Sequence, residues 1–370
     1  MVSNLWSKTP FSLKKNSSTV VLLAAAMGLA AYLKQPLWTF PFMVDWNTIV
    51  TLSGLLLITT GIKESGLFYL LACRISQRIG SERLLALFLI FLAAVLSMFL
   101  TNDIALFIVV PLTLHLQRIA DSDYSRIIIF EAIAVNAGSS LTPVGNPQNI
   151  FLWHQWGISF PLFVREMTPL VLVMSAWLLV MTLFCFPSTK IKVSNSHDHA
   201  VDRGLFILSA LMLAAFIVST ELGYGIYFLP VVFAVLMPIR KGLVLKPDWG
   251  LILLFIVIFI DLHLACQLKV LKHLFSTLDL SSPPALFLSG ALFSQVISNV
   301  PSAILLAHHS SDYKMIAYGV NIGGNGLLIG SFANLIALRL TNKRSSYISF
   351  HVYSIPYFLI TLITSCRLLI

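Results

Sequence analysis

The sequence is poor in charged residues. Of its 370 residues only 11% are Asp, Glu, Lys or Arg, whereas 58% are hydrophobic, and the mean hydropathy is +0.89. A soluble domain carries roughly 25% charged residues, so this composition excludes a soluble protein. The apolar runs are continuous rather than alternating, which excludes the pattern of a transmembrane β-barrel.

Cysteines and enzyme motifs are also scarce. The four cysteines are scattered singly and form no Cys-x-x-Cys pair. The chain has no G-x-x-x-x-G-K-[ST], so direct use of ATP is excluded, and it has no G-x-G-x-x-G, G-x-S-x-G or H-E-x-x-H. We therefore expect no enzyme, no bound cofactor and no metal site.

Apolar runs long enough to cross a membrane recur along the whole chain. A helix needs about 20 apolar residues to cross a hydrocarbon layer of ~30 Å. We interpret about nine runs as spans, at 19–34, 46–62, 127–157, 162–186, 204–220, 226–240, 249–266, 315–338 and 347–369. Two further apolar pieces, 84–116 and 284–308, are interrupted by polar residues and are predicted to be re-entrant hairpins. The expected fold is an all-α polytopic membrane protein.

Lys and Arg segregate by side in this topology. With the N-terminus in the cytoplasm, 18 of the 24 Lys and Arg residues fall on the cytoplasmic side and 6 on the far side, as the positive-inside rule requires. This placement accounts for the net charge of +9 without a nucleic acid partner. Lys14 and Lys15 could begin a signal peptide, but the span after them has a counterpart in an internal repeat, so we expect it to be retained.

The sequence contains that repeat in three blocks, in the same order. "DWNTIVTLSGLLLI" and "FLTNDIALFIVVPL" in the first half resemble "DWGLILLFIVIFID" and "VISNVPSAILLAH" in the second. "VNAGSSLTPVGNPQNI" at 135–150 matches "VNIGGNGLLIGSFANL" at 320–335, with a constant offset of 185 residues. Three ordered matches indicate that the chain consists of two related halves.

The number of crossings predicts how the two halves are oriented. Each half crosses four times and one connecting span lies between them, so the second half enters the membrane from the opposite face. We predict inverted repeats over 1–186 and 226–370, joined by a linker and connecting span at 187–225. Each repeat would hold one hairpin (84–116 or 284–308) and one broken helix (127–157 or 315–338).

The polar triplet Thr101-Asn102-Asp103 interrupts the first hairpin. As one helix, 84–116 would be about 50 Å long at ~1.5 Å per residue, which is too long for a simple span, so we predict a fold at Thr101. The returning helix would direct its free backbone N–H groups at the membrane centre, where they suit an anion. Ser298-Asn299 takes the corresponding place in the second half.

Gly, Pro and Asn residues break the run 127–157 halfway across the membrane. Unpaired backbone groups cannot face lipid, so such a break lines a cavity or is packed in protein. A surface loop over 137–147 is the alternative, but the repetition of the break at 322–332 favours an unwound helix. We predict that hairpin tips and breaks form one substrate and ion site from Thr101, Asn102, Asp103, Gly138, Thr142, Gly145, Asn146, Asn149, Ser298, Asn299, Gly323, Gly324, Asn325, Gly330, Ser331 and Asn334.

Several ionisable residues lie in or near the apolar runs. Asp103 is expected to carry the coupling proton or to help hold Na⁺, because an unpaired carboxylate is costly inside a membrane; a helix cap near the interface is the alternative. Glu131, one turn from Arg126, is expected to pair or snorkel, or to serve transport. Asp261 and His263 would form an interface pair or move protons. No metal is expected at the loop residues His197, Asp198 and His199.

The repeat blocks and several other strings of this sequence resemble the ion transporter superfamily. That superfamily includes arsenite permeases, one class of Na⁺/H⁺ antiporters, citrate carriers and divalent anion–sodium symporters. The likeness covers nearly the whole chain, in "TLSGL", "FLTNDIALFIVVPLT", "VNAGSSLTPVGNPQNI", "SQVISNVPSAILL", "GSFANLIALR" and "YSIP". The resemblance implies inverted repeats with hairpins and broken helices, the bacterial inner membrane, and a scaffold that often forms a homodimer.

The resemblance also implies site residues. In the dicarboxylate branch, Ser-Asn-Thr triplets at the hairpin tips bind substrate carboxylate and Na⁺. The corresponding residues are Thr101-Asn102-Asp103 and Ser298-Asn299-Val300, and both differ from that triplet. The acid after Asn102 is more like the arsenite-permease branch.

We therefore expect a secondary active transporter, or permease, for a small anion or oxyanion. It would work by alternating access as a symporter or antiporter coupled to H⁺ or Na⁺, with Asn102 and Asn299 donating hydrogen bonds to the substrate. Arsenite or metalloid efflux and Na⁺/H⁺ antiport are alternatives within transport. A non-transporting membrane enzyme or scaffold is the alternative from another class.

Overall fold

The computed structural model describes residues 17–76, 79–120, 123–190, 201–240, 242–341 and 345–370. Regular structure within these ranges is helical, apart from one isolated β-bridge between Ser81 and Lys190. This confirms the predicted all-α class. Lys14, Lys15 and the loop from His197 to His199 lie outside the described residues.

The helices of the first half follow the predicted runs. They are α1 (Ser17–Leu33), the 3-10 helix η2 (Leu37–Met43), α2 (Trp46–Glu64), α3 (Leu67–Ser76), α4 (Glu82–Phe99), α5 (Asn102–Ala120), α6 (Ser125–Ser139), α7 (Pro147–Trp156) and α8 (Phe160–Cys185).

The connecting helix and the second half complete the chain. They are α9 (Arg203–Glu221), α10 (Gly225–Ile239), α11 (Trp249–Ala265), α12 (Lys269–Thr277), α13 (Pro283–Ile297), α14 (Asn299–Ala307), α15 (Tyr313–Gly323), η3 (Leu328–Gly330), α16 (Phe332–Thr341) and α17 (Ser345–Leu368).

All four predicted interruptions are present. The hairpins fold between α4 and α5 and between α13 and α14, and the broken runs divide into α6 with α7 and α15 with α16. The alternative of a surface loop at 137–147 is wrong, because ten of its eleven residues are buried and Leu141 is half-buried. The Gly- and Asn-rich stretch is therefore internal polar backbone, whose groups must find partners inside the protein.

Four helices are each long and apolar enough to cross a membrane, namely α4, α8, α9 and α17. Two bent pairs, α1 with η2 and α11 with α12, would raise the number to six within the described ranges. The count of about nine spans stays a prediction, because it includes two broken runs that are each shared between shorter helices.

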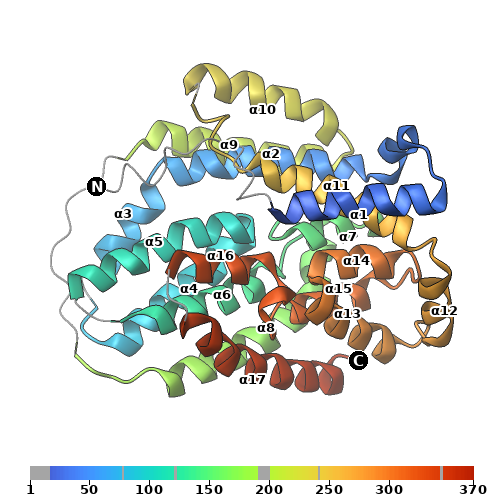
Figure 1. The fold of residues 1–370 in the computed structure, drawn as a ribbon. Helices are drawn as coiled ribbons and strands as arrows, with labels where there is room; N and C mark the ends of the chain where they lie inside the picture. The colour runs from blue at the N-terminus through green and yellow to red at the C-terminus, as the bar shows by residue number, and fades with distance from the viewer. Residues whose placement is uncertain (1–16, 77–78, 121–122, 191–200, 241, 342–344) are drawn as a thin grey trace.

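The same helix pairs recur in the two halves (Figure 1). Helix α4 packs against α6, and α13 packs against α15; across the halves, α5 packs against α16 and α14 against α7. The outer helices also exchange partners, since α1 lies on α11 and α10 lies on α2. A repeat predicts such recurrence, whereas the orientation of each half in a membrane stays a prediction.

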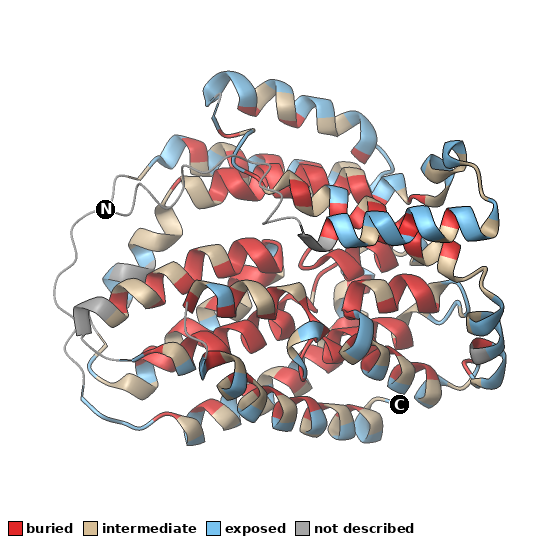
Figure 2. Cartoon of the chain, in the orientation of Figure 1, coloured by how far each residue is buried: buried red, intermediate tan, exposed pale blue. Residues whose placement is uncertain are grey.

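Glycines allow the closest of these contacts. A Cβ on Gly138 would overlap the carbonyl oxygen of Ala94 in α4, and a Cβ on Gly323 would overlap the side chain of Ser294 in α13. The two glycines are repeat partners, so each half uses the same device to bring a broken helix against its hairpin. Figure 2 shows the buried residues concentrated in this central bundle, whereas α1 and α10 are exposed along one side.

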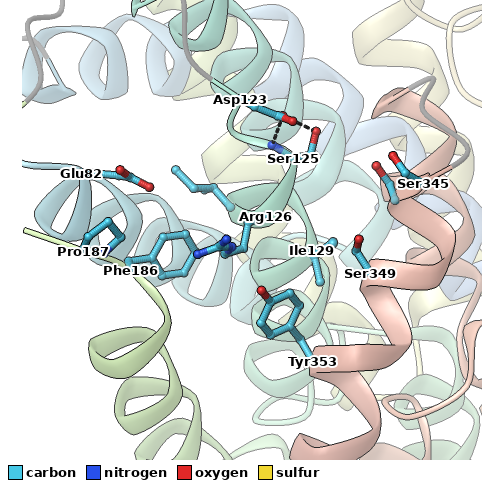
Figure 3. A pocket seen from close by; sticks show the side chains of 12 residues that line it. Glu82, Asp123, Ser125, Arg126, Ile129, Phe186, Pro187, Ser345, Ser349 and Tyr353 are labelled. Atoms are coloured by element: carbon cyan, nitrogen blue, oxygen red, sulfur yellow. Dashed lines mark hydrogen bonds between the residues drawn. The ribbon is translucent and has the colours of Figure 1, made fainter. Parts of the chain in front are cut away.

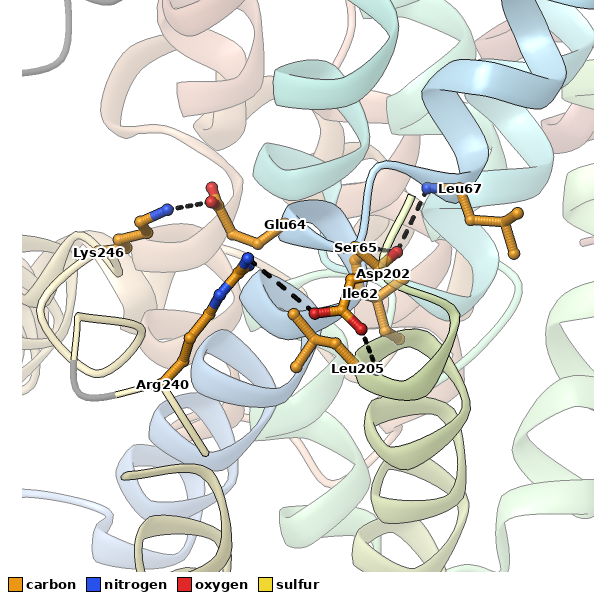
Figure 4. A network of polar contacts seen from close by, with 8 residues as sticks. All are labelled: Ile62, Glu64, Ser65, Leu67, Asp202, Leu205, Arg240 and Lys246. Atoms are coloured by element: carbon orange, nitrogen blue, oxygen red, sulfur yellow. Dashed lines mark hydrogen bonds and ion pairs between the residues drawn. The ribbon is translucent and has the colours of Figure 1, made fainter. Parts of the chain in front are cut away.

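An ion-pair cluster joins the ends of α2, α9 and α10 (Figure 4). Asp202 caps α9 by accepting a hydrogen bond from the Leu205 N–H at 2.9 Å, and it lies 4.0 Å from Arg240. Lys246 pairs with Glu64 beside it. We call these four charged residues the α2–α9 cluster; its two pairs join the end of α10 and the loop after it to the start of α9 and to the end of α2.

Candidate substrate and ion site

The two hairpin tips and the second arms of both broken helices meet at one narrow cavity. Its lining includes the first residues of α5, α14, α7 and α16, together with two side chains of α11: Asn102, Asp103, Asn299, Val300, Pro147, Gln148, Ser331, Phe332, Leu251 and Phe255. Its volume of about 10 Å³ is room for about one water molecule. Four helix starts, each with the partial positive charge of a helix N-terminus, therefore share one wall. Some of their N–H groups already have partners, since the Asn149 N–H donates to Asn146 and the Ala333 N–H to Ser331.

The first hairpin tip is tied to the first break. The Asn102 N–H donates to the carbonyl oxygen of Gly145 at 2.9 Å, and the Asn102 side-chain oxygen accepts from the Asp103 N–H at 3.0 Å. Both side chains are buried, and the Thr101 hydroxyl beside them has no hydrogen-bond partner within the described ranges. The tip thus places an amide and a carboxyl group in the cavity lining, and a buried hydroxyl without a described partner precedes them in the chain.

The second tip has a strained backbone. Ser298 has φ 75° and ψ 157°, a region that residues with a Cβ rarely adopt and that costs about 1–3 kcal/mol. The conformation is held from both sides, because the Ser298 N–H donates to the Ser294 carbonyl and the Ser298 carbonyl accepts from Ser302. This turn reverses the chain within one residue and starts α14 at Asn299.

Four asparagines cross-link the two broken helices. Asn136 donates to the side-chain oxygen of Asn334 at 2.8 Å, and Asn321 donates to that of Asn149 at 2.7 Å. Asn136 and Asn321 are repeat partners, as are Asn149 and Asn334, so each half makes the same bond to the other. We call this set the asparagine crossing.

Backbone carbonyls complete the crossing with the same symmetry. Asn149 donates to the Ser139 carbonyl at 3.3 Å, and Asn334 donates to the Gly324 carbonyl at 2.9 Å. Ser139 and Gly324 are again related by the offset of 185 residues. The crossing therefore satisfies carbonyl groups that the helix breaks leave unpaired.

The two breaks differ in how completely their side chains are paired. In the first, Ser140, Asn146 and Gln148 all donate to the side-chain oxygen of Asn321, at 3.1, 3.0 and 3.3 Å, and only the Gln148 side-chain oxygen has no partner among the described residues. In the second, Asn325 takes the place of Ser140, and both polar atoms of its buried side chain have no hydrogen-bond partner among the described residues. A buried amide without a partner is unfavourable, so this side chain is suited to bind an ion or a water molecule.

Only four of the sixteen predicted site residues line the cavity, namely Asn102, Asp103, Asn299 and Ser331. The other twelve lie outside its lining, and six of these support the breaks through close packing or a backbone contact. The Thr142 hydroxyl donates to the Met98 carbonyl at 2.6 Å and so joins the break to α4. A Cβ on Gly145 would overlap the Ser139 carbonyl, and one on Gly330 would lie 2.5 Å from the Gly323 carbonyl. The supporting residues are Gly138, Thr142, Gly145, Gly323, Gly324 and Gly330.

Sequence reasoning missed Asn136 and Asn321 as part of this site. Both were visible as matched asparagines in the two "VN" strings, each inside an otherwise apolar helix arm. A buried amide at the same place in both halves was the signal that could have found them.

The predicted pairing of Glu131 with Arg126 is wrong. Glu131 is fully buried and accepts a hydrogen bond from the Thr113 hydroxyl, whereas Arg126 donates to the Cys185 carbonyl at 2.7 Å. Residues five apart lie about 140° apart around a helix, so the two side chains leave α6 on different sides.

Of the two alternatives for Asp261 and His263, the interface pair is wrong, and a role in proton movement stays a prediction. Both carboxylate oxygens of Asp261 are buried with no hydrogen-bond partner in the described ranges. The His263 ring instead lies 6.0 Å from the ring of His308, at the end of α14. Residues two apart do not face each other on a helix.

Comparison with known proteins gives consistent matches. The CitMHS family model, described as citrate transporter, matches residues 6–312. The chain is 43% identical over 340 residues to the inner membrane protein YbiR of Escherichia coli K12, covering 92% of this chain and 91% of YbiR.

Two further relatives are named as transporters. The uncharacterized transporter MJ0456 of Methanocaldococcus jannaschii is 36% identical over 303 residues, covering 81% of this chain and 82% of its own. The uncharacterized transporter Rv2684 of Mycobacterium tuberculosis H37Rv is 24% identical over 355 residues, covering 83% and 81%. Family and relatives thus agree on a membrane transporter.

Proposed function

The chain belongs to the citrate transporter family, and we propose that it is a secondary active transporter for a small anion or oxyanion, coupled to H⁺ or Na⁺. The observation that carries this proposal is the convergence of four helix starts on one buried cavity. Backbone N–H groups at helix starts bind anions without a charged side chain. The lining contains no Lys or Arg, so dipoles and amides would hold the substrate.

The substrate contacts would come from both halves. The amides of Asn102 and Asn299, which line the cavity from the two hairpin tips, would donate hydrogen bonds to its oxygens. Val300, Leu251 and Phe255 form an apolar part of the wall, which favours a compact substrate over one with charges all round. Because the cavity has room for about one water molecule, binding requires the hairpin tips to move away from the broken helices.

The coupling ion would bind beside the substrate. Asp103 is the one acidic side chain of the lining, and binding H⁺ or Na⁺ there would remove its repulsion of an anion. Asn325, whose side chain is buried without a partner among described residues, supplies a further oxygen near the second break. Ion and substrate would then favour each other's binding, which is the basis of coupled transport.

Membrane placement follows from the same proposal. The two halves would be inverted repeats in the bacterial inner membrane, with the N-terminus in the cytoplasm and sites at their interface. The exposed apolar helices would face lipid or a second copy in a homodimer.

The test is uptake into proteoliposomes of the purified protein. Labelled citrate, sulfate, phosphate and arsenite would be offered one at a time, with pH and Na⁺ gradients imposed separately. Accumulation of one anion that depends on one gradient supports the proposal. Absence of gradient-dependent movement of every anion offered would reject it.

Na⁺/H⁺ antiport is the second candidate, and Asp103 is the observation that favours it. An acidic side chain in a cavity lined by no basic residue suits a cation more directly than an anion. Proton efflux driven by Na⁺ entry, with no anion added, would identify this activity.

A further inference from the structure

A larger cavity of about 390 Å³ lies outside the candidate site (Figure 3). Its walls come from the first residues of α4, α6 and α17 and from the residues that follow α8. We call it the α6–α17 cavity and define it by Arg126, Glu82, Asp123, Ser346 and Ser349, all of which line it.

The α6–α17 cavity presents charges of both signs. The Arg126 guanidinium lies 5.9 Å from the ring centres of both Phe186 and Tyr353, so two aromatic rings hold it in place. Its one described hydrogen bond, to the Cys185 carbonyl, occupies one of five N–H donors. Asp123 and Glu82 supply carboxylates on the same walls. Asp123 already accepts from the N–H and hydroxyl of Ser125, and Glu82 accepts from the Thr189 hydroxyl, so a ligand would share these carboxylates.

Hydroxyl groups at the start of α17 add acceptors and donors. Ser346 is 2% exposed, and its hydroxyl has no hydrogen-bond partner within the part of the chain that the structure describes. Ser349 follows it by one turn along the cavity wall. A buried hydroxyl without a partner is unfavourable unless a ligand supplies one, and helix starts favour phosphate oxygens.

The helices that form the cavity walls also carry exposed apolar side chains on other sides. Leu84 in α4, Phe184 in α8 and Ile348 in α17 are examples, the last two being 86% and 75% exposed. In a membrane protein such side chains contact acyl chains. A ligand with a polar head in the cavity would therefore be held by helices that contact lipid tails.

We propose that the α6–α17 cavity binds the headgroup of a phospholipid that carries both a phosphate and a primary ammonium. The phosphate pairs with Arg126 and the α17 hydroxyls, because guanidinium groups bind phosphate through charge-assisted hydrogen bonds. The ammonium lies with Glu82 and Asp123. The two charges of the headgroup match the two kinds of charge in the cavity, which a purely anionic lipid does not.

Native mass spectrometry of the full-length protein tests this inference. Delipidated protein would be titrated with phosphatidylethanolamine, phosphatidylglycerol and phosphatidylcholine of equal chain length. We expect the tightest binding for phosphatidylethanolamine. Ser346→Ala should weaken it about tenfold, the effect of one lost hydrogen bond to a charged group, without lowering the melting temperature, because that hydroxyl makes no described bond in the protein.

A second variant and a control separate charge recognition from folding. Glu82→Gln should remove the preference for phosphatidylethanolamine over phosphatidylcholine while leaving phosphate binding intact. The control is Arg240→Gln in the α2–α9 cluster, which removes one charge from an ion pair outside the cavity lining. It should leave the affinity for each of the three lipids unchanged.

Two results would overturn the inference. One is equal affinity for phosphatidylethanolamine in the parent protein and Ser346→Ala. The other is complete displacement of the lipid by soluble phosphoethanolamine at equal concentration, which would assign the cavity to a soluble ligand. Neither readout uses transport, so the outcome is independent of the proposed function.

Discussion

The two broken helices share a backbone design and differ in their side chains. Both have an asparagine that bonds across to the other half, at Asn136 and Asn321. Around Asn321, three side chains of the first break saturate the amide oxygen, whereas the second break leaves Asn325 buried and unpartnered among the described residues. The first break therefore mainly holds the halves together and leaves only the Gln148 side-chain oxygen unpartnered, whereas the second leaves both polar atoms of Asn325 unpartnered among the described residues.

The hairpin tips differ in a parallel way. The first tip carries Asp103, where the second carries Val300, and the second is strained at Ser298 whereas the first has no residue with positive φ. An internal repeat thus supplies two similar backbones, and side-chain differences give the two tips different chemistry at one shared cavity.

The largest expected effect is on stability, from breaking the asparagine crossing unequally. Asn321→Ala removes the acceptor of three donors and should cost about 3 kcal/mol or more, at about 1 kcal/mol for each bond. Asn136→Ala removes donors to Asn334 and to the Gly324 carbonyl and should cost less. Melting temperatures in detergent should fall in the order parent, Asn136→Ala, Asn321→Ala.

A control for this series is Thr182→Val, which removes one buried hydroxyl bond to the Leu178 carbonyl within α8. It should shift the melting temperature least. Asn321 accepts three bonds from the first break, whereas Asn136 donates two bonds to the second. An equal fall in melting temperature for Asn136→Ala and Asn321→Ala would therefore contradict the closer pairing of the first break.

The next effect concerns coupling through the acidic tip. Asp103→Asn keeps the size of the side chain and removes its charge, so gradient dependence of transport should fall by an order of magnitude or more while substrate exchange across the membrane persists. Uptake driven by an imposed gradient would be compared with counterflow at equal concentrations. Retained gradient dependence would exclude Asp103 as the coupling residue.

A smaller effect should distinguish the second break, where Asn325 is unpartnered among the described residues, from the first, where Ser140 is hydrogen-bonded. Asn325→Ala removes a group that makes no described bond and should leave stability within about 1 kcal/mol of the parent, while weakening ion-dependent transport. Ser140→Ala removes bonds to the Asn136 carbonyl and to Asn321 and should lower stability instead. The melting temperature and the ion dependence of uptake would be measured for both variants. The same change in both variants would contradict the difference between the two breaks.

The smallest effect tests the strained tip. Ser298→Gly relieves a backbone conformation that costs about 1–3 kcal/mol and adds the entropy of a glycine, about 0.5–1 kcal/mol, so it should stabilise the protein slightly. Thr101→Gly in the first tip relieves no such strain and should destabilise it. Thermal unfolding of the pair gives opposite signs, and two losses of stability would refute the strain at Ser298.

Helix positions and their interruptions were predictable from the sequence because they depend on local chemistry. Apolar runs define α2 and α8 to within two residues, and Asp45 begins α2 by accepting bonds from the Asn47 and Thr48 N–H groups. Polar residues at Thr101 and Ser298 interrupt the hairpins where expected. The gathering of both tips at one cavity agrees with the repeat, although which residues line it required the structure.

Side-chain partners were less predictable, since they depend on packing between distant segments. The crossing bonds join residues 198 and 172 positions apart, a register that no local pattern contains. Glu131 was assigned to Arg126 by nearness in sequence, but its partner is Thr113 on α5. The α6–α17 cavity likewise joins helix starts that are far apart in the chain.

The most direct test of the central claim is gradient-driven uptake by Asn102→Ala and Asn299→Ala in proteoliposomes. If both tips bind one substrate, each variant should lower uptake at least about tenfold, the effect of losing roughly 1.4 kcal/mol of binding, while Asn47→Ala on the exposed start of α2 matches the parent. Uptake in both tip variants equal to that of Asn47→Ala would contradict a shared site.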